Sequence, residues 1–232
     1  MSLSQKRECI VVSVGGSCIV PDDIDTGFLT KLRDLVERKT AEGLSFYIIT
    51  GGGKLARRMR DAAVAVTPQV SRDELDWIGI AATRLNAELV RSLFEKHNVP
   101  AVVLDTAIAP HTDSPVIVAG GVKPGNSSDW AAVMAAKAMG ATKLVNLSNI
   151  DYVYTADPRT NPDAVKIEQT TWNEFRKLLP TEWDPGLSAP FDPIAAKEAE
   201  AMGLEVAVIN GTKLDEFEHY ISGEPFIGTV IS

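Results

Sequence analysis

The sequence predicts an α/β fold in which a mainly parallel sheet is sandwiched between two layers of helices. Short runs of apolar, β-branched residues alternate with segments of helical periodicity, as expected for parallel strands that are covered on both faces. The length of 232 residues suits one α/β unit of two lobes. Hydrophobic residues make up 45% of the chain, which is enough for a packed core.

Six segments are expected to form strands. Cys9–Val14 reads Cys-Ile-Val-Val-Ser-Val and is typical of a buried strand. The other five share its short length and apolar character: 46–49, 101–104, 116–119, 144–147 and 206–209.

Helices are expected between these strands. One apolar helical face is formed by Phe28, Leu32, Leu35 and Val36, and a second by Ile78, Ala82, Leu85, Leu89 and Leu93. The Ala-rich segment 130–139 stops at Gly140, a residue that favours helix ends. Asp192 and Pro193 are typical of a helix N-cap and first turn, and Gly203 is expected to close that helix.

Charge and cysteine content exclude several classes of protein. The net charge of −8 disfavours binding to nucleic acid, which depends on Lys and Arg. Cys9 and Cys18 form no CxxC pair and have no partners for a zinc site, so both are expected to be reduced thiols. The polar residues 1–8 do not resemble a signal peptide, and no apolar run approaches the roughly 20 residues that span a bilayer. A cytoplasmic protein is therefore expected.

Three glycine-rich turns follow predicted strands, at Gly15-Gly16-Ser17, Gly51-Gly52-Gly53-Lys54 and Gly120-Gly121. Ligands of open α/β sheets bind beyond the carboxyl ends of the strands. Glycine there lets backbone N–H groups approach a phosphate closely. We expect the three turns to meet at one sheet edge and to form an anion site.

The turns match neither the GxxxxGK[ST] loop nor the GxGxxG fingerprint, so a P-loop NTPase and a Rossmann dehydrogenase are both disfavoured. Arg57 offers a bidentate phosphate ligand and Lys54 a point charge. Arg58 and Arg60 are interpreted as part of a solvated helix face. For Asp129 a plain helix N-cap is the alternative to a site role.

Several motifs together resemble the amino-acid-kinase superfamily. They are Gly15-Gly16-Ser17, the Gly-Gly-Gly-Lys-Leu-Ala-Arg block 51–57, the Asp-Trp-Ile-Gly-Ile block 76–80, Asn149-Ile150-Asp151 and the Tyr-Thr-Ala-Asp-Pro block 154–158. The Phe-Asp-Pro-Ile-Ala-Ala-Lys block 191–197 and the Gly-Thr-Val-Ile block 228–231 narrow the resemblance to the archaeal type of uridylate (UMP) kinase.

The resemblance implies a set of site residues. The catalytic group would be Arg57, Asp129 and Lys54. ATP would contact Gly16, Ser17, Gly53, Arg57, Ser148, Asn149, Tyr154 and Asp157. UMP would contact Gly52, Asp76, Val122, Lys123, Pro124, Gly125, Asn126, Ser127 and Ser128. No side chain is assigned as a metal ligand.

The resemblance also implies a reaction and an assembly. A single amino-acid-kinase domain over residues 1–232 would place its acceptor lobe at about 1–142 and its ATP lobe at about 143–232. It would transfer the γ-phosphate of ATP, carried with Mg²⁺, to UMP in pyrimidine nucleotide biosynthesis. The partners would be small nucleotides and other copies of the chain, in a hexamer built from dimers.

Four residues depart from the family pattern. Tyr152 replaces a glycine, Val122 replaces a threonine, and Ser127 and Ser128 replace paired threonines. They leave two alternatives open, which are a kinase of the same fold with another acceptor and a non-catalytic nucleotide- or oxyanion-binding protein similar to the molybdate storage proteins. An isopentenyl phosphate kinase is disfavoured because no histidine lies near residues 51–57.

Overall fold

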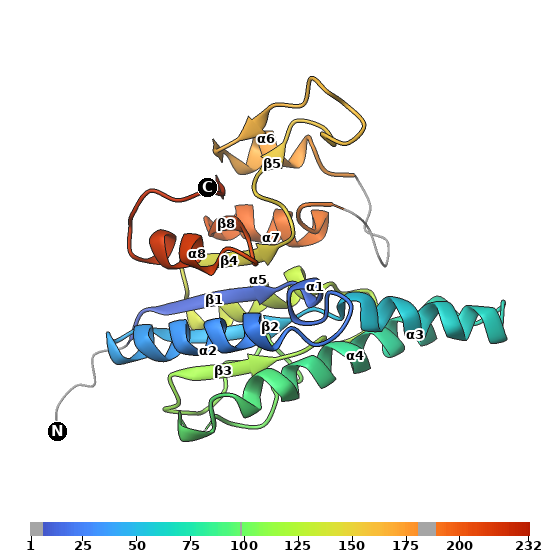
Figure 1. Ribbon diagram of the computed structural model, residues 1–232, viewed down its shortest axis with the longest axis horizontal. Coiled ribbons are helices and arrows are strands. Elements are labelled where there is room, and N and C mark those ends of the chain that lie inside the picture. Colours follow the sequence, from blue (N-terminus) through green and yellow to red (C-terminus); the bar gives the residue numbers. More distant parts are fainter. Residues whose placement is uncertain (1–6, 98, 181–188) are drawn as a thin grey trace.

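The computed structural model describes residues 7–97, 99–180 and 189–232. Within them, a seven-stranded sheet lies between two layers of helices, and a two-stranded antiparallel hairpin, β5–β6, stands apart from it (Figure 1). The strand order of the main sheet is β3-β2-β1-β4-β8-β9-β7. The predicted αβα sandwich is confirmed.

The strands are β1 (Cys9–Val14), β2 (Ser45–Thr50), β3 (Val116–Ala119), β4 (Lys143–Ser148), β5 (Val153–Tyr154), β6 (Lys166–Ile167), β7 (Gln169–Thr170), β8 (Glu205–Asn210) and β9 (Thr229–Ile231). The helices are α1 (Gly16–Ile19), α2 (Thr26–Ala41), α3 (Gly53–Val66), α4 (Arg72–Ser92), the 3₁₀ turn η1 (Glu95–His97), α5 (Ser128–Met139), α6 (Trp172–Arg176), α7 (Pro193–Met202) and α8 (Leu214–Ile221).

Strand β1 lies at the centre of the parallel part of the sheet. It pairs in parallel with β2 on one side and with β4 on the other, so that Val12 is opposite both Ile48 and Val145. The pairs β2–β3 and β4–β8 are also parallel. The carboxyl ends of these five strands therefore lie along one edge of the sheet, where the glycine-rich turns begin.

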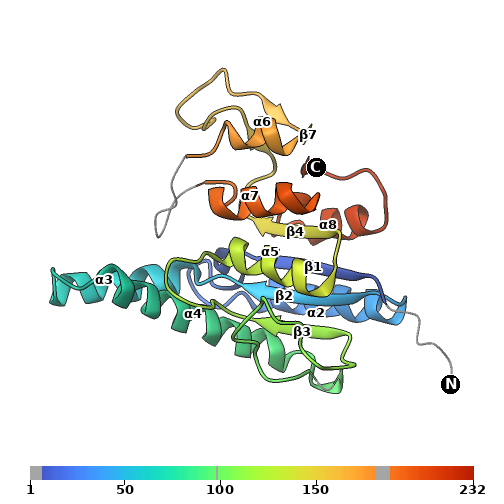
Figure 2. The same ribbon diagram turned by 180° about the vertical axis from the view of Figure 1, so that it is seen from behind.

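The two faces of the sheet form two separate cores. Alternate side chains point to opposite faces, so Val12 and Ile48 pack on one side while Val11 and Tyr47 pack on the other. Helices α2 and α8 cover the first face (Figure 1), and the Ala-rich α5 and α7 cover the second (Figure 2). Small alanines let α5 lie close to the sheet, which brings its first turn to the carboxyl edge.

One predicted strand is absent. Residues 101–104 form only an isolated bridge between Val103 and Ala119 beside the edge strand β3. The chain then turns away, because the Asp105 carboxylate accepts a hydrogen bond from the Ala107 N–H at 3.0 Å, and Leu104 is 55% exposed. The apolar composition of this segment therefore reflects partial packing beside the sheet and not membership in it.

Helix α4 buries most of the predicted apolar face, since Ala82 is buried and Leu89 and Leu93 pack against the first core, but Leu85 is an exception. Leu85 is 63% exposed, whereas Ile80, Ala87 and Val90 face the protein interior. Asn86 is also buried and uses its side-chain amide to bind a backbone carbonyl. The buried face of α4 thus includes a polar residue with a structural role, which a search for apolar residues alone does not detect.

The predicted helix ends are confirmed at α5 and α7. Gly140 and Gly203 both adopt left-handed backbone angles, with φ of 65° and 61°. Asp192 accepts hydrogen bonds from two backbone N–H groups at the start of α7, and Pro193 occupies its first turn.

Among the described residues, none of the helices is both long and apolar enough to cross a membrane. Most of segment 1–8, interpreted above as unlike a signal peptide, lies outside the described residues.

Candidate functional site

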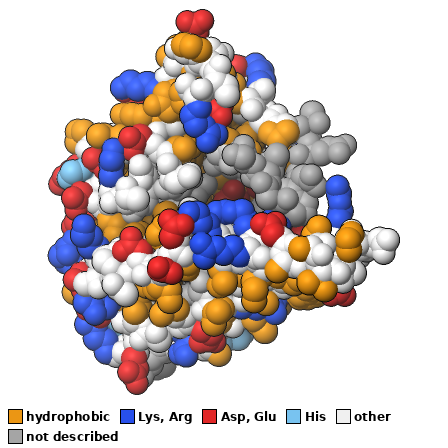
Figure 3. All heavy atoms as spheres, turned by 45° about the vertical axis from the view of Figure 1, so that its right-hand side comes forward, with side chains coloured by type: hydrophobic (Ala, Val, Ile, Leu, Met, Phe, Trp, Pro, Cys, Tyr) orange, Lys and Arg blue, Asp and Glu red, His pale blue; other side chains and the backbone are white. Residues whose placement is uncertain are grey.

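The three glycine-rich turns meet around one cavity, as the sequence predicts. Gly16, Gly52 and Gly121 all line it, and its volume is about 360 Å³. Figure 3 shows the hollow, with Lys and Arg side chains gathered along its rim. The turns leave adjacent parallel strands β1, β2 and β3, so the sheet order alone brings them together.

The first two turns are packed backbone against backbone. A Cβ atom on Gly16 would lie 2.1 Å from the Gly53 nitrogen, and one on Gly53 would lie 2.4 Å from the Gly16 carbonyl carbon. Gly53 also has a φ of 59°, which favours glycine. Helix α3 begins at this contact, and its N-cap residue, Gly52, supplies no side-chain acceptor. Backbone N–H groups at the start of α3 therefore remain available to an anion.

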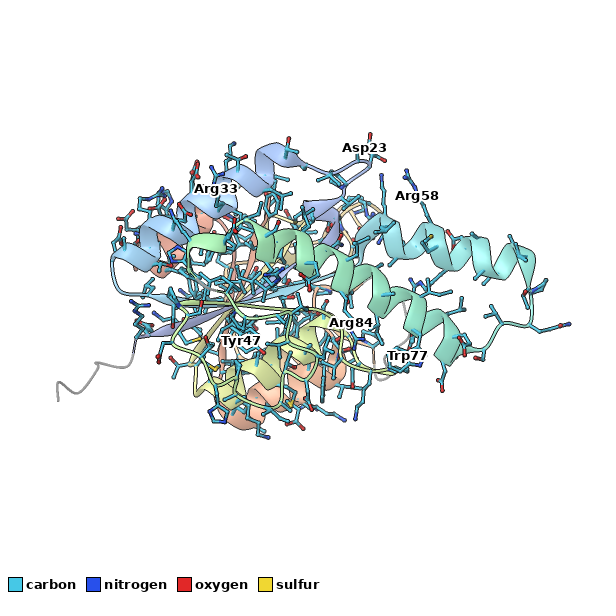
Figure 4. The ribbon with its side chains drawn as sticks, turned by 90° about the horizontal axis from the view of Figure 1, so that it is seen from below. Asp23, Arg33, Tyr47, Arg58, Trp77 and Arg84 are labelled. Carbon is cyan, nitrogen blue, oxygen red and sulfur yellow. The ribbon has the colours of Figure 1, made fainter. Side chains whose placement is uncertain are left out.

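Helix α4 fixes these turns through side-chain hydrogen bonds. The Asn86 amide donates to the Gly51 carbonyl at 2.8 Å, and the Gly121 N–H donates to the Thr83 hydroxyl at 2.6 Å. Arg84 donates to the carbonyls of Gly121 and Val122 at 3.1 and 3.0 Å. Its guanidinium also lies 5.9 Å from the ring centre of Trp77, and Figure 4 shows these two side chains together on α4.

The sequence interpretation did not find Thr83, Arg84 and Asn86. Two of them, Thr83 and Asn86, are polar residues next to an apolar helix stripe, and that pattern was the available signal. All three hold the cavity wall in place through hydrogen bonds to the turns, and Thr83 also lines the cavity.

The loop after β3 forms the outer wall of the cavity. The Gly125 N–H donates to the Asp76 carboxylate at 2.8 Å, which links this loop to α4. Asp76 lines the cavity, together with Asn126, Ser127 and Ser128 from the loop. Four other residues predicted to contact UMP do not line it: Val122, Lys123, Pro124 and Gly125. The Val122 side chain packs instead against the second core.

Two arginines of α3 line the cavity and one lysine does not. Arg57 and Arg60 contribute to the lining, whereas the predicted catalytic Lys54 forms an ion pair with Asp22 at 2.6 Å. Arg58 lies 3.9 Å from the same carboxylate. The interpretation of Arg58 and Arg60 as one solvated face is therefore wrong for Arg60, because helical geometry places residues 57 and 60 on the same side.

Two aspartates lie where α5 meets α7. The Ser13 hydroxyl and the Asp192 N–H donate to Asp129 at 3.3 and 3.1 Å. Burial and the nearby Asp192 carboxylate raise the pKa of Asp129 to about 7, although both hydrogen bonds oppose that rise. The N-cap alternative for Asp129 is wrong, because the Ser127 hydroxyl caps α5 by accepting the Trp130 N–H at 3.0 Å.

The predicted ATP ligands divide between this cavity and the neighbouring region. Gly16, Ser17, Gly53 and Arg57 line the cavity. Ser148, at the end of β4, and Asn149, Tyr154 and Asp157 lie along the chain that follows β4 and do not line it. Arg159 binds Asp157 through two nitrogens, and this pairing lowers the pKa of the carboxylate to about 2.

Asp151 and Tyr152, which follow β4, make further polar contacts that the sequence interpretation did not identify. Lys213 and Asn210 both contact the Asp151 carboxylate at 2.8 Å, and they lower its pKa. The Lys166 ammonium lies 4.9 Å from the centre of the Tyr152 ring, the residue that replaces the family glycine.

The fold and the cavity define an α/β protein with a glycine-lined cavity at the carboxyl edge of a parallel sheet, a place suited to an anionic ligand. The profile of the amino acid kinase family matches residues 8–210, and the chain belongs to this family.

Individual relatives extend over nearly the whole chain. The chain is 31% identical over 225 residues to the uridylate kinase of Natronomonas pharaonis, covering 96% of this chain and 97% of the relative. It is 35% identical to the uridylate kinase of Halorubrum lacusprofundi over 206 residues, which are 88% of this chain and 84% of that protein. The crystal structure of the uridylate kinase from Archaeoglobus fulgidus superposes with a TM-score of 0.80 at 29% identity, covering 96% and 99% of the two chains. The predicted family and fold are confirmed.

Proposed function

We propose that this protein is a UMP kinase, which transfers the γ-phosphate of ATP to UMP and releases UDP and ADP in pyrimidine nucleotide biosynthesis. One observation carries the proposal. Three glycine-rich turns and the Arg57 side chain converge on a single cavity, in a chain whose full-length relatives are uridylate kinases. The cavity volume of about 360 Å³ falls within the usual size range of small-molecule sites.

The acceptor is assigned to the half of the molecule that carries β1 to β3, residues 1–142. Gly52 and Asp76 line this side, and Asp76 is already tied to the following loop through Gly125. The loop 122–128 would enclose the acceptor, with Asn126, Ser127 and Ser128 in the cavity wall.

The ATP phosphates are assigned to Gly16, Ser17, Gly53 and Arg57. The ATP base and ribose are assigned to the half that follows, residues 143–232, at Ser148, Asn149, Tyr154 and Asp157. The two halves meet at β1 and β4, where their strands pair in parallel.

The chemistry needs positioning and charge neutralisation more than covalent catalysis. A UMP phosphate oxygen attacks the γ-phosphorus of ATP, and the bond between that phosphorus and the bridging oxygen of ADP breaks. The attacking oxygen is already anionic at neutral pH, so no general base is required. Arg57 would stabilise charge that develops on the transferring group.

Asp129 is assigned a positioning role in this reaction, because it holds the Ser13 hydroxyl and the Asp192 backbone beside the glycine-rich turns. Lys54 is kept as a proposed catalytic cation, and its pairing with Asp22 is exposed to solvent, where ion pairs exchange at little cost.

Mg²⁺ would enter with ATP and neutralise the phosphate charge, since this metal commonly keeps phosphate oxygens and waters among its ligands. The described residues offer no group of three or more acidic, His or Cys side chains for a metal ion.

A homo-oligomer, with a hexamer built from dimers as the specific form, and a cytoplasmic location are proposed from the same family resemblance. Nucleic acid is not proposed as a partner, because the chain has a net charge of −8.

A panel of acceptors tests the proposal. The protein is incubated with Mg-ATP and either UMP, CMP, acetylglutamate, aspartate or isopentenyl phosphate, and ADP release is followed. Turnover with UMP, well above the other acceptors, is expected. Turnover with a different acceptor would keep the kinase class and replace the substrate. ATP binding without turnover on any acceptor would favour a non-catalytic nucleotide-binding protein.

A further inference from the structure

Arg60 lines the cavity, but none of the roles proposed above is assigned to it. It lies one turn along α3 from Arg57 and faces the same cavity, although half-buried where Arg57 is exposed. No ion pair or hydrogen bond to Arg60 or Arg57 is found among the residues that the structure describes. A half-buried guanidinium without a protein partner has unused donors in a place where solvation is reduced.

The carboxylates of the cavity do not neutralise these arginines. Asp76 accepts from the Gly125 N–H, Asp129 from Ser13 and from the Asp192 N–H, and Asp192 caps α7. Each carboxylate therefore already serves a protein donor. The two guanidiniums are left to face the space that a ligand would occupy.

The antiparallel packing of α3 and α4 places Arg60 on the acceptor side. Near the start of α3, a Cβ on Gly52 would lie 3.5 Å from the Gly79 carbonyl and 3.6 Å from Thr83. Because the helices run in opposite directions, moving forward along α3 to Arg60 corresponds to moving back along α4 toward Asp76. Arg57 is thus closer to the glycine contact assigned to ATP, and Arg60 is closer to Asp76.

We propose that Arg60 is a specificity-determining residue that binds the phosphate of the acceptor and thereby selects a nucleoside monophosphate over an unphosphorylated nucleoside. This inference rests on the proposed function and adds a residue to it. Arginine suits the role, because its planar donors match two phosphate oxygens at once.

The test is a comparison of two ligands in matched variants. Calorimetric Kd values for UMP and uridine are measured for the wild type, Arg60→Gln, Arg60→Lys and the control Arg58→Gln. Arg58 lies on the same helix, carries the same charge and points toward the loop at Asp23, away from Trp77 and Arg84 (Figure 4). Steady-state kinetics with Mg-ATP and UMP, and melting temperatures, are recorded for the same four proteins.

In Arg60→Gln, the preference for UMP over uridine is expected to fall about tenfold or more, the size expected when a charge-assisted hydrogen bond is lost. The KM for UMP should rise by a similar factor, while kcat, the KM for ATP and the melting temperature stay close to wild type. Arg60→Lys should retain part of the preference for UMP. The control Arg58→Gln should retain all of it.

Three outcomes would overturn the assignment. An unchanged preference in Arg60→Gln removes Arg60 from the acceptor site, and an equal loss in Arg58→Gln reduces the effect to general charge. A loss confined to kcat or to the KM for ATP places Arg60 on the donor side. A wild-type protein that neither turns over nor prefers UMP overturns the proposed function itself, and this result is seen before any variant is compared.

Discussion

The two sides of the proposed transfer site are built in different ways. On the side of β1 to β3, glycine backbones touch each other, and the buried Asn86 and the partly buried Thr83 hold the turns in place. On the side that follows β4, the strands β5, β6 and β7 are only two residues long, and exposed ion pairs such as Asp157–Arg159 and Lys166–Glu168 lie in or beside them. Close backbone contacts tolerate little change, whereas exposed pairs contribute little and adapt easily. The first side is therefore expected to fix the geometry of transfer and the second to accommodate the rest of the donor.

The strongest test of this difference is Gly16→Ala. The added Cβ would lie 2.1 Å from the Gly53 nitrogen, so one of the two turns must move. Turnover with UMP should fall by about a hundredfold or more, because small displacements of reacting groups have large effects on rate. Gly27→Ala is the matched control, since its Cβ meets only the end of the Asp25 side chain at 3.2 Å. Near-normal kcat in Gly16→Ala would remove the backbone contact from the explanation.

A second test removes a positive charge from the side of β1 to β3 without changing its backbone. Arg57→Ala should lower kcat at least about tenfold through loss of transition-state charge stabilisation. Arg57 is exposed and forms no hydrogen bond or ion pair with the residues that the structure describes, so the melting temperature should not change. Arg58→Ala serves as control. Turnover of Arg57→Ala close to that of the wild type would exclude Arg57 from the site.

The Asp129 carboxylate links the two sides, because it accepts hydrogen bonds from Ser13 and from Asp192. The pH dependence of stability tests whether its pKa is raised. Its folded-state pKa of about 7 is above the ordinary value of 3.8, so the folded protein binds more protons than the unfolded chain between these values. This group therefore stabilises the fold at low pH, and that contribution is lost as the pH rises from about 4 to 7, at about 1.4 kcal/mol per pKa unit at most.

Urea unfolding of the wild type and Asp129→Asn at several pH values between 4 and 7.5 measures this effect. The difference in unfolding free energy should shift in favour of the variant as the pH rises, since the amide cannot ionise. Parallel curves for the two proteins would mean that Asp129 titrates normally.

The smallest effect is expected on the exposed side. Arg159→Ala frees Asp157, whose pKa should return toward its usual range. Because the pair is exposed, the melting temperature should not change measurably, and kcat should stay within about threefold of wild type. A large loss of kcat or of melting temperature would show that this region is as tightly constrained as the glycine-rich turns.

The strands and turns that position the cavity could be predicted from the sequence. Cys9–Val14 and the three glycine turns are local patterns, and parallel pairing of their strands follows from the alternation with helices. The supporting hydrogen bonds were not predictable in the same way. Thr83 and Gly121 are distant in sequence, and neither residue type identifies its partner. The role of Arg60 depends on which side of α3 faces the cavity, and helical spacing alone does not determine that.

The ligand contacts assigned to the site residues, inside the cavity and outside it, remain predictions. Lys54 and Asp157 both lie in ion pairs with neighbouring residues, and the kinetic variants described above bear on the second of them. The segment 101–104 had the composition of a strand, but one turn at Asp105 directed the chain away from the sheet edge after a single bridge. The apolar composition of a segment indicates that it is partly buried. Whether it pairs with the sheet or only packs beside it depends on the path of the chain.

The central strand β1 lies at the boundary between the two halves of the sheet, since it pairs with β2 on one side and with β4 on the other, and Gly15 and Gly16 follow its last residue. A rotation of one half against the other about this strand would move atoms in proportion to their distance from it. The two nucleoside ends would then swing farthest, while the phosphorus atom and its attacking oxygen, close to the axis, would keep nearly the same separation. Such an arrangement would let the protein open to exchange nucleotides and close again onto an unchanged reaction geometry.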